Sequence, residues 1–530
     1  MLHTGKQHGF MFVVNSDKTA NGINPSQGFR PYFRNLTIMG AVLFLSACAN
    51  KINDLPKEPQ LEIPQSWEGS SAFEIEPAED DLEQKIEAEP KPVQENWLSS
   101  FDDPELQRYV TQALKNSPDL LDSAAQLRTA IEQVSITGAN LWPSVQANLN
   151  GRQSLQFFGT GDGVAAEPTT VQTIAQTLDI SWEADIWLKL TQRKKAAALS
   201  AKAQMELFKS AELSLVANLS RAWYNLVTNK LQLDLAQRRL ESFQNTDQLI
   251  DENYQRGLRS ALDVYQSRTN VQLNISALAE AKFSYIQTLR TFKTLLGDYP
   301  SGDMEFEAKL PELTTTVSAG LPAQLLTRRP DIRASQLQYE SRIASARAAQ
   351  RDLYPTINFT GSIGDSRTQF DSAFDTDSVI ETLVAGIAAP IFAAGSLRSA
   401  RDQAYHEAES AYANLLRTAL TAFEEVENSL SQETLLAQQH AAIKEAVNLA
   451  EGGLNLALDQ YQSGIETYTT VLQSQRSLFD TLENELNIRN ALLQNRIGLH
   501  LALGGDFLST EIRENENHEP PSIRKQQQSE

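Results

Sequence analysis

The feature that most constrains this chain is a run of 69 residues, 188–256, that contains no glycine or proline. These two residues interrupt helices most reliably, and the run is rich in Ala, Leu, Gln, Glu, Lys and Arg, so it predicts one long helix. A rise of 1.5 Å per residue gives this helix a length of roughly 100 Å. That exceeds both the size of a compact domain and the roughly 20 residues that cross a bilayer, so we expect the helix to span a gap.

A turn follows the long helix, at Tyr254-Gln255-Arg256-Gly257. A second helical stretch then covers 258–296 and stops at Gly297, which predicts a helical hairpin with its tip near Gly257. This return arm is shorter than the long helix. The helical pattern over 104–141 has about the missing length, so we expect it to stack end to end with the return arm.

Apolar and polar residues alternate over 145–150 and over 177–186, on either side of the Gly-rich stretch 159–163. A period of two over about 10 residues is what a transmembrane β-barrel strand requires, although a soluble half-buried hairpin gives the same pattern. No segment has 18 consecutive apolar residues, so a membrane crossing would have to use strands.

The second half of the chain repeats the first. Two proline pairs are each 25 residues apart, 118 to 143 and 330 to 355, and an offset of 207 maps the first turn and return arm onto the second without a gap. The matched residues include Tyr254, Gly257, Val264, Leu296 and Gly297, which correspond to Tyr461, Gly464, Val471, Leu503 and Gly504.

These patterns predict a signal peptide over 1–47, followed by a lipidated N terminus with an extended acidic, proline-rich tether over 48–103. Two repeats follow, over 104–310 and 311–505, and a polar tail covers 506–530. The first repeat has a β-hairpin over 143–187, the long helix and the helix 258–296. The second has a helix over 322–354, a β-hairpin over 355–393, a long helix over 396–462 and a helix over 465–503.

Four strands per chain cannot close a barrel, and lipid does not tolerate open sheet edges. Closure therefore demands several copies, and three copies of four strands would give twelve, a size found among outer-membrane barrels. The predicted fold is mainly α with a small β-barrel part, a barrel of long helical hairpins joined to a transmembrane β-barrel.

Cys48 is the single cysteine of the chain. It follows Arg30, Arg34 and an apolar stretch over 36–45, within Leu45-Ser46-Ala47-Cys48. This order is typical of a secretory signal, and the four residues resemble the bacterial lipobox, in which the cysteine carries S-diacylglycerol and N-acyl groups. The alternative is an ordinary buried cysteine beside a weak apolar segment.

Nothing in the sequence predicts an enzyme. The net charge of −21 disfavours a nucleic-acid partner. The six histidines are scattered without metal-ligand spacing, and 159–163 lacks the lysine of a phosphate loop. We expect no metal and no cofactor apart from the lipid on Cys48.

Residues Leu321-Pro322-Ala323-Gln324-Leu325-Leu326-Thr327-Arg328-Arg329-Pro330-Asp331-Ile332, with the Cys48 motif, resemble the TolC-type outer-membrane efflux factors, in their lipoprotein (NodT-like) branch. The resemblance covers about residues 45–510. It implies a lipid-anchored homotrimer in the outer membrane of a Gram-negative bacterium, with a helical tunnel in the periplasm. It also implies an exit duct for small molecules such as drugs, with a periplasmic adaptor and an inner-membrane pump of the resistance-nodulation-division (RND) type as partners.

In that family the hairpin tips form the periplasmic entrance and contact the adaptor. The resemblance assigns one tip to Tyr254, Arg256, Gly257 and Asp263, and the other to Tyr461, Gly464, Glu466, Thr470 and Gln473. The chain departs from the family at Gln473, where Asp is frequent, and at Thr469, where Leu is frequent. Asp263 and Glu466 are then the remaining acidic candidates for the gate, and solvated turn residues are the alternative.

Three other functions stay open. A type I protein secretion system uses the same kind of conduit. A periplasmic adaptor is also a lipoprotein with a helical hairpin, but it normally has one hairpin where this chain has two. A structural coiled-coil protein of the envelope predicts sustained heptads and no strands.

Overall fold

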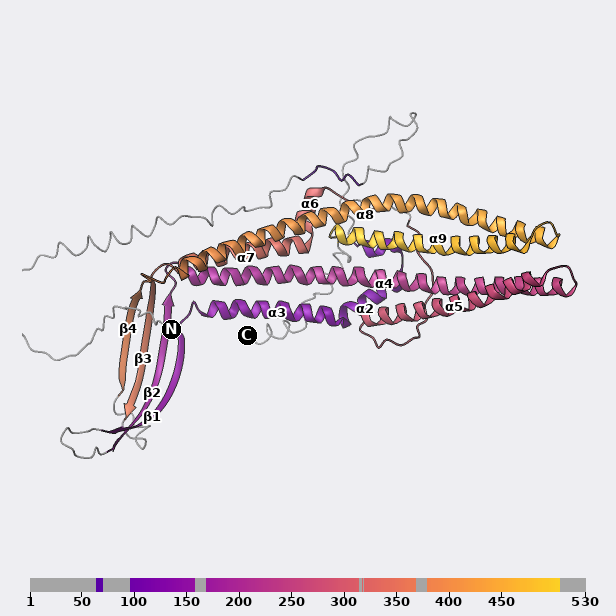
Figure 1. Cartoon of the computed structure of the whole chain (residues 1–530). Coiled ribbons are helices and arrows are strands. Elements are labelled where there is room, and N and C mark those ends of the chain that lie inside the picture. Colours follow the sequence, from indigo (N-terminus) through magenta and orange to yellow (C-terminus); the bar gives the residue numbers. More distant parts are fainter. Residues whose placement is uncertain are drawn as a thin grey trace, which may run out of the picture. The chain divides into compact units, whose positions relative to one another are not determined.

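The computed structural model describes residues 63–69, 96–157, 168–313, 317, 319–367 and 379–505. The predicted signal peptide, Cys48, the stretch 159–163 and the C-terminal tail lie outside the described residues. Figure 1 shows a mainly helical chain with one small sheet, which confirms the predicted fold class in its secondary structure. Among the described helices, none combines the length and apolarity that a bilayer span requires.

The described elements follow one another in the order η4 (Trp97–Phe101), α2 (Pro104–Asn116), α3 (Pro118–Ala139), β1 (Ser144–Phe157), β2 (Pro168–Ala184), α4 (Lys189–Gln255), α5 (Ala261–Leu295), α6 (Pro322–Arg328), α7 (Pro330–Arg351), β3 (Thr356–Arg367), β4 (Ile380–Ala388), α8 (Ser396–Gln462) and α9 (Tyr468–Ala502). They divide into two compact units. The sheet unit contains Arg128–Ala203 and Gln336–Asn414. The hairpin unit contains the described parts of Leu61–Leu127, Gln204–Ser335 and Leu415–Glu530.

The structure contains the internal repeat. Helices α4 and α8 both have 67 residues, and α5 and α9 both have 35. Their first residues differ by the offset found in the sequence, since 396 − 189 = 207 and 468 − 261 = 207. The two long hairpins are therefore built to the same length.

Each long hairpin turns at a glycine in the left-handed conformation, with φ of 74° at Gly257 and 76° at Gly464. The N–H of Gly257 donates to the carbonyl of Tyr254 (2.8 Å), and the N–H of Leu258 donates to that of Asn253 (2.9 Å). This pair of bonds is a Schellman motif, and the same pair closes the end of α8 at Gly464. Side chains with a Cβ are strained at this φ, so glycine is needed at both turns.

The return helices begin three residues later than the sequence analysis places them, at 261 and 468 rather than 258 and 465. A capping box sets the start of α5, because the Ser260 side chain accepts from the N–H of Asp263 (3.3 Å) and the Asp263 carboxylate accepts from the N–H of Ser260 (3.2 Å). Thr467 occupies the equivalent position before α9 but makes no capping hydrogen bond with its side chain.

The four strands form one antiparallel sheet in the order β1-β2-β3-β4. Its register aligns most of the large apolar residues on one face, which carries Val145, Ala147, Leu149, Leu178, Ile180, Trp182, Ile357, Phe359, Ile363, Leu383 and Ile387, together with Gln176, Asp365 and Glu381 toward one end. The opposite face is mainly polar and carries Gln146, Asn148, Asn150, Thr177, Asp179, Ser181, Asn358, Thr360, Ser362 and Thr382, together with Ile380 and Val384 of β4. Among the described strands, β1 and β4 each pair along one edge only.

Charged groups join β2, α4 and α7 within the sheet unit. The buried Lys189 ammonium contacts the carboxylates of Glu183 (2.5 Å) and Asp352 (3.8 Å), and Arg193 binds both oxygens of Asp352 at 2.9 Å. The chain enters α4 through Leu188 at φ 60°, and the equivalent position before α8 is Gly395 at φ 83°. The repeat thus reuses one backbone turn between strand and long helix.

The core of the hairpin unit includes residues that the sequence analysis places in an extended tether. Trp97 and Phe101 are buried in η4, and the Trp97 ring stacks on that of His500 at 5.4 Å. Asp103 accepts a hydrogen bond from Trp223 Nε1 (2.7 Å). The tether interpretation is wrong for residues 96–103, because these aromatic side chains bury more apolar surface than the acidic composition of the segment suggests.

Residues 63–69 also pack on the hairpin unit. The Trp67 ring lies 6.1 Å from Phe423 of α8, and its Nε1 donates to the carbonyl of Gly320 (3.0 Å). The N–H of Glu68 donates to the Glu427 carboxylate (3.1 Å). A second part of the predicted tether is therefore held against α8.

Two predicted helices, 104–141 and 322–354, are each broken in the structure. Ser117 and Arg329 adopt extended conformations, with ψ of 122° and 123°, because each precedes a proline whose ring disfavours the helical conformation. The glycine caps of α5 and α9 lie against these breaks. A Cβ on Gly297 would lie 2.8 Å from the carbonyl oxygen of Asn116, and one on Gly504 would lie 3.0 Å from Cγ of Arg329. The end of α5 therefore meets the break between α2 and α3. The predicted end-to-end stacking of the whole helix 104–141 is wrong for α2, because the Tyr109 ring of α2 packs on that of Phe292 in α5 at 5.2 Å.

Candidate functional site

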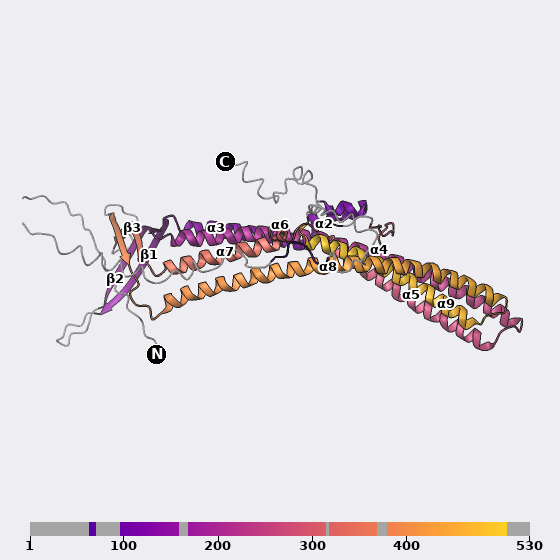
Figure 2. The ribbon, with the colours of Figure 1, turned by 90° about the horizontal axis from the view of Figure 1, so that it is seen from above.

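The two hairpins run side by side in the hairpin unit and end together at their tips (Figure 1) (Figure 2). An apolar cluster joins them, made of Ile250, Val264, Leu454, Ala457, Tyr461, Tyr468, Val471 and Leu478. Burial in this cluster raises the pKa of Tyr461, and it raises that of Tyr468 to about 12. Both phenols are therefore neutral at physiological pH.

Arg259 bridges the tips. It lies two residues after Gly257 and donates from its guanidinium to the main-chain carbonyl of Tyr461 (2.9 Å). The same guanidinium lies 4.1 Å from the centre of the Tyr461 ring, within cation–π distance. Arg259 thus caps the end of α8 with a charge and covers the buried Tyr461.

A second set of polar contacts joins α9 to α4 and α5 above the tips. The buried Gln475 donates from Nε2 to Thr246 Oγ1 (2.8 Å) and to Ser242 Oγ (3.0 Å). Arg476 donates to Oδ1 of Asn270 (2.7 Å). We call Arg259, Gln475 and Arg476 the polar clasp, because their hydrogen bonds hold the second hairpin against the first.

The residues that the sequence analysis assigned to the hairpin tips do lie there in the structure. The two acids predicted for the gate, Asp263 and Glu466, bond separately, each within its own tip. Asp263 bonds within the capping box of α5, and Glu466 accepts a hydrogen bond from Thr470 (2.9 Å) in its own tip. Tyr254, Arg256, Gly257, Gly464 and Gln473 are exposed. Of the predicted residues, Tyr461 is the one that the structure places in the contact between the hairpins.

The sequence analysis missed all three members of the polar clasp. One signal could have found Arg259, because the 207-residue offset places it at the position of Glu466 (259 + 207 = 466). Opposite charges at equivalent positions of two tips indicate that the tips have different roles. The partners of Gln475 and Arg476 follow from how the helices pack, which no local pattern gives.

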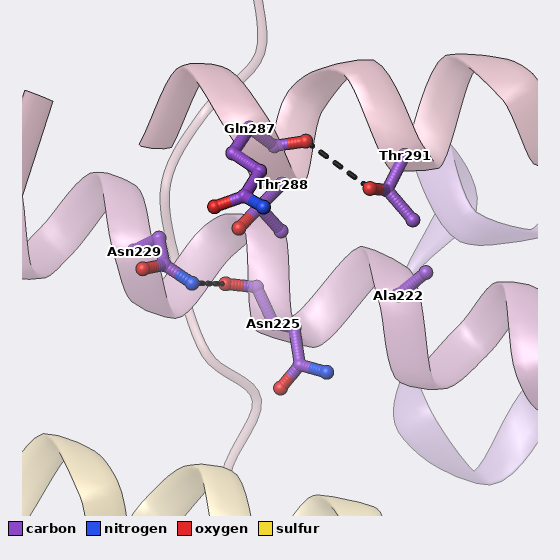
Figure 3. A pocket seen from close by; sticks show the side chains of 6 residues that line it. All are labelled: Ala222, Asn225, Asn229, Gln287, Thr288 and Thr291. Atoms are coloured by element: carbon purple, nitrogen blue, oxygen red, sulfur yellow. Dashed lines mark hydrogen bonds between the residues drawn. The ribbon is translucent and has the colours of Figure 1, made fainter. Parts of the chain in front are cut away.

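A polar hollow of about 290 Å³ lies between α4 and α5 in the hairpin unit. Figure 3 shows its lining, Ala222, Asn225, Asn229, Gln287, Thr288 and Thr291. The amide of Asn229 donates to the carbonyl of Asn225 (2.8 Å), and the Thr291 hydroxyl donates to that of Gln287 (3.2 Å). Asn225 Oδ1 also accepts from the amide of Asn490 in α9 (2.8 Å), so the hollow is lined by neutral amides and hydroxyls that bond to the surrounding helices. Across the described residues, no three His, Cys, Asp or Glu side chains gather as metal ligands.

Comparisons with known proteins agree on one family. The model of the family described as "Outer membrane efflux protein" matches residues 109–298 and 321–505. The pyoverdine export outer membrane protein OpmQ of Pseudomonas aeruginosa is 28% identical over 90% of this chain and 98% of its own length. The cation efflux system protein CusC of Escherichia coli is 27% identical over 78% of this chain and 88% of its own.

Solved structures share the fold. The CmeC outer membrane channel of Campylobacter jejuni superposes with a TM-score of 0.75 over 88% of this chain and 98% of its own, at 21% identity. At this identity the likeness shows a common architecture of sheet and long hairpins.

Proposed function

Because the chain belongs to the outer membrane efflux protein family, we propose that it assembles as a homotrimer and that its hairpin tips gate the duct. Its function is that of the outer-membrane channel of a tripartite efflux pump, a transport function rather than an enzymatic one. The observation that supports the trimer is the four-stranded sheet, which is largely apolar on one face and largely polar on the other, and in which β1 and β4 each pair along one edge only among the described strands.

The edges of the sheet support a β-barrel that is closed by identical copies of the chain. A strand edge in lipid leaves backbone N–H and C=O groups without partners, which costs several kcal/mol for each group. Pairing β1 of one copy with β4 of the next removes both edges, and three copies give a twelve-stranded barrel. The apolar face then contacts lipid. The polar face, on which Asn148 donates to Asp179 (2.6 Å), lines a water-filled lumen.

The hairpin unit also leaves surfaces for neighbouring copies. On α5, Tyr265, Leu273 and Phe283 are between 58% and 73% exposed. On α8, Leu420, Leu449 and Leu456 are between 55% and 68% exposed. Large apolar side chains that remain exposed along two outer helix faces are typical of surfaces buried by assembly. We therefore place α5 of one copy beside α8 of the next.

The polar clasp supports gating at the tips. Its contacts are hydrogen bonds at the periplasmic end of a duct, so water can replace them when the second hairpin moves. The proposed partners are a periplasmic adaptor at the tips and an inner-membrane pump of the RND type. The names of OpmQ and CusC describe export of pyoverdine and of cations, which favours small molecules over the proteins of a type I secretion system.

A crosslink between the tips tests the gate. Leu262 and Ile465 are 63% and 74% exposed and neighbour Asp263 and Glu466, so a cysteine at each position is accessible without disturbing the capping box. We expect a reducible bis-maleimide to stop drug efflux in cells that carry the double variant, and a reductant to restore it. Each single variant treated with the same reagent is the control. Unchanged efflux, with the crosslink demonstrated on a gel, would refute gating at the tips.

Lipidation of Cys48 is the second part of the proposal. Its support is the position of the chain's single cysteine after an apolar stretch with small residues. We expect Cys48→Ala to abolish incorporation of a labelled fatty acid while heat-modifiable trimers still form. A Cys48→Ala protein that still carries the label would overturn the assignment of the lipid.

A further inference from the structure

Helix α8 contains two adjacent glycines, Gly452 and Gly453, in the interior of its 67 residues. Glycine is among the weakest helix formers, and glycine pairs are a recognised cause of helix bending. Both residues are exposed, and a Cβ built on either one would meet no atom within 4 Å. Neither close packing nor a left-handed conformation requires glycine here, in contrast to Gly257 and Gly464 at the tips.

The first repeat has ordinary helix residues at the equivalent positions, Asn245 and Thr246 (452 − 207 = 245). Thr246 is buried, donates to the carbonyl of Ser242 (3.0 Å) and accepts from Gln475 (2.8 Å). α4 is therefore held at this level by the hydrogen bond between Thr246 and Gln475 of the polar clasp. α8 has no side chain there at all, so the two long helices differ in stiffness at the same height.

The segment of α8 beyond the glycines is bound to the rest of its own hairpin by apolar packing. Leu454, Ala457 and Tyr461 are buried against Tyr468 and Val471 of α9. Its attachment to the first hairpin combines the apolar contacts of Ile250 and Val264 in the same cluster with hydrogen bonds through Arg259 at the tip and through Gln475 and Arg476 of α9. The end of the second hairpin can thus move as one body once the clasp opens and these apolar contacts separate.

We infer that Gly452 and Gly453 form a hinge in α8, about which the end of the second hairpin bends away from the first when the gate opens. The inference rests on the proposed gating at the tips and adds which hairpin moves and where it bends. The first hairpin stays straight, since α4 has no equivalent weak point and its capping box fixes the start of α5. Opening the clasp then exposes Arg259, which is half-buried, and Gln475, which is buried, to water.

The test compares channel opening in variants of the full-length protein in planar bilayers with potassium chloride. Gly452→Ala/Gly453→Ala has room for both methyl groups and favours the straight helix, so we expect about a tenfold lower open probability. Asn245→Ala is the matched control, an exposed position of α4 at the same height, and should leave opening unchanged. Glu451→Gly/Asn455→Gly, added to the alanine pair at exposed positions on either side of it, should restore opening.

Four outcomes decide the matter. A loss of opening that is confined to the alanine pair and reversed by the displaced glycines supports the hinge. Equal opening of the alanine pair and the wild type overturns it and leaves the gated duct intact. An equal loss of opening in Asn245→Ala also overturns the hinge, because a stiffer helix anywhere near the tips would then be enough to reduce opening. If none of these proteins opens in the bilayer, not even an Arg259→Ala/Arg476→Ala variant with a weakened clasp, the gated duct itself is overturned.

Discussion

Replacing Arg329 with alanine lowers the free energy of unfolding by about 1.5–3 kcal/mol, because it removes the charge-assisted hydrogen bonds of a buried guanidinium. The guanidinium is buried and binds Asp331 (2.7 Å), Glu425 (2.6 Å) and the carbonyl of Ala502 (3.0 Å). Burial alone lowers the pKa of Arg329, but the bonds to Asp331 and Glu425 outweigh it and leave the pKa raised. Alanine would leave two carboxylates and the last turn of α9 without their donor.

The matched control is Arg328→Ala, because Arg328 precedes it in the same motif and is partly exposed. We expect a loss below about 1 kcal/mol there. Arg329→Lys should fall between the two, since an ammonium cannot reproduce the planar fork that binds Asp331. The shift in denaturation midpoint measures all three variants. An Arg329→Ala protein as stable as the wild type would show that the motif does not join α7, α8 and α9.

Acidification from pH 7 to pH 5 destabilises the protein by about 2 kcal/mol through His500 alone. Burial lowers the pKa of this histidine to about 3, with a further contribution from the charge of Arg496. The unfolded chain takes up a proton near pH 6.5 and the folded chain does not. The stability is therefore fully present above pH 6.5 and is lost progressively as the pH falls toward 3.

The structure explains why His500 stays neutral. Its side chain is fully buried between Trp97 and Phe101, and among the described residues neither ring nitrogen has a hydrogen-bond partner. His500→Phe should keep the stacking and abolish this part of the acid sensitivity. His406→Phe, at an exposed histidine of α8, should leave it unchanged. Thermal melts at both pH values measure the difference, and a His500→Phe protein that loses as much stability as the wild type would contradict the assignment.

The periodic features of the fold could be predicted from the sequence. The run 188–256 without glycine or proline predicted the first long helix, the period of two predicted the strands, and the offset of 207 predicted the second long helix and the equal hairpins. Two helix breaks were missed although Pro118 and Pro330 mark them, because the helical pattern continues on both sides of each proline. The rule for residues before proline identifies Ser117 and Arg329 once the helix ends are known.

Features that depend on distant contacts could not be predicted. Trp67 and Trp97 lie in acidic, proline-rich sequence, and their docking depends on surfaces that α8 and α9 form hundreds of residues later. The contact of Arg259 with Tyr461 joins residues 202 positions apart. The sequence therefore located the tips correctly but assigned the gate to acids that bond within their own turns.

The two return helices, α5 and α9, differ in how their first turns are capped. A capping hydrogen bond contributes about 1 kcal/mol, so α9, whose N-cap Thr467 makes none with its side chain, frays at its first turn more readily than α5, whose N-cap Ser260 belongs to a capping box. Two hairpins of equal length therefore differ in local stability at their tips, and exchanging the residues at the two N-caps would exchange that difference.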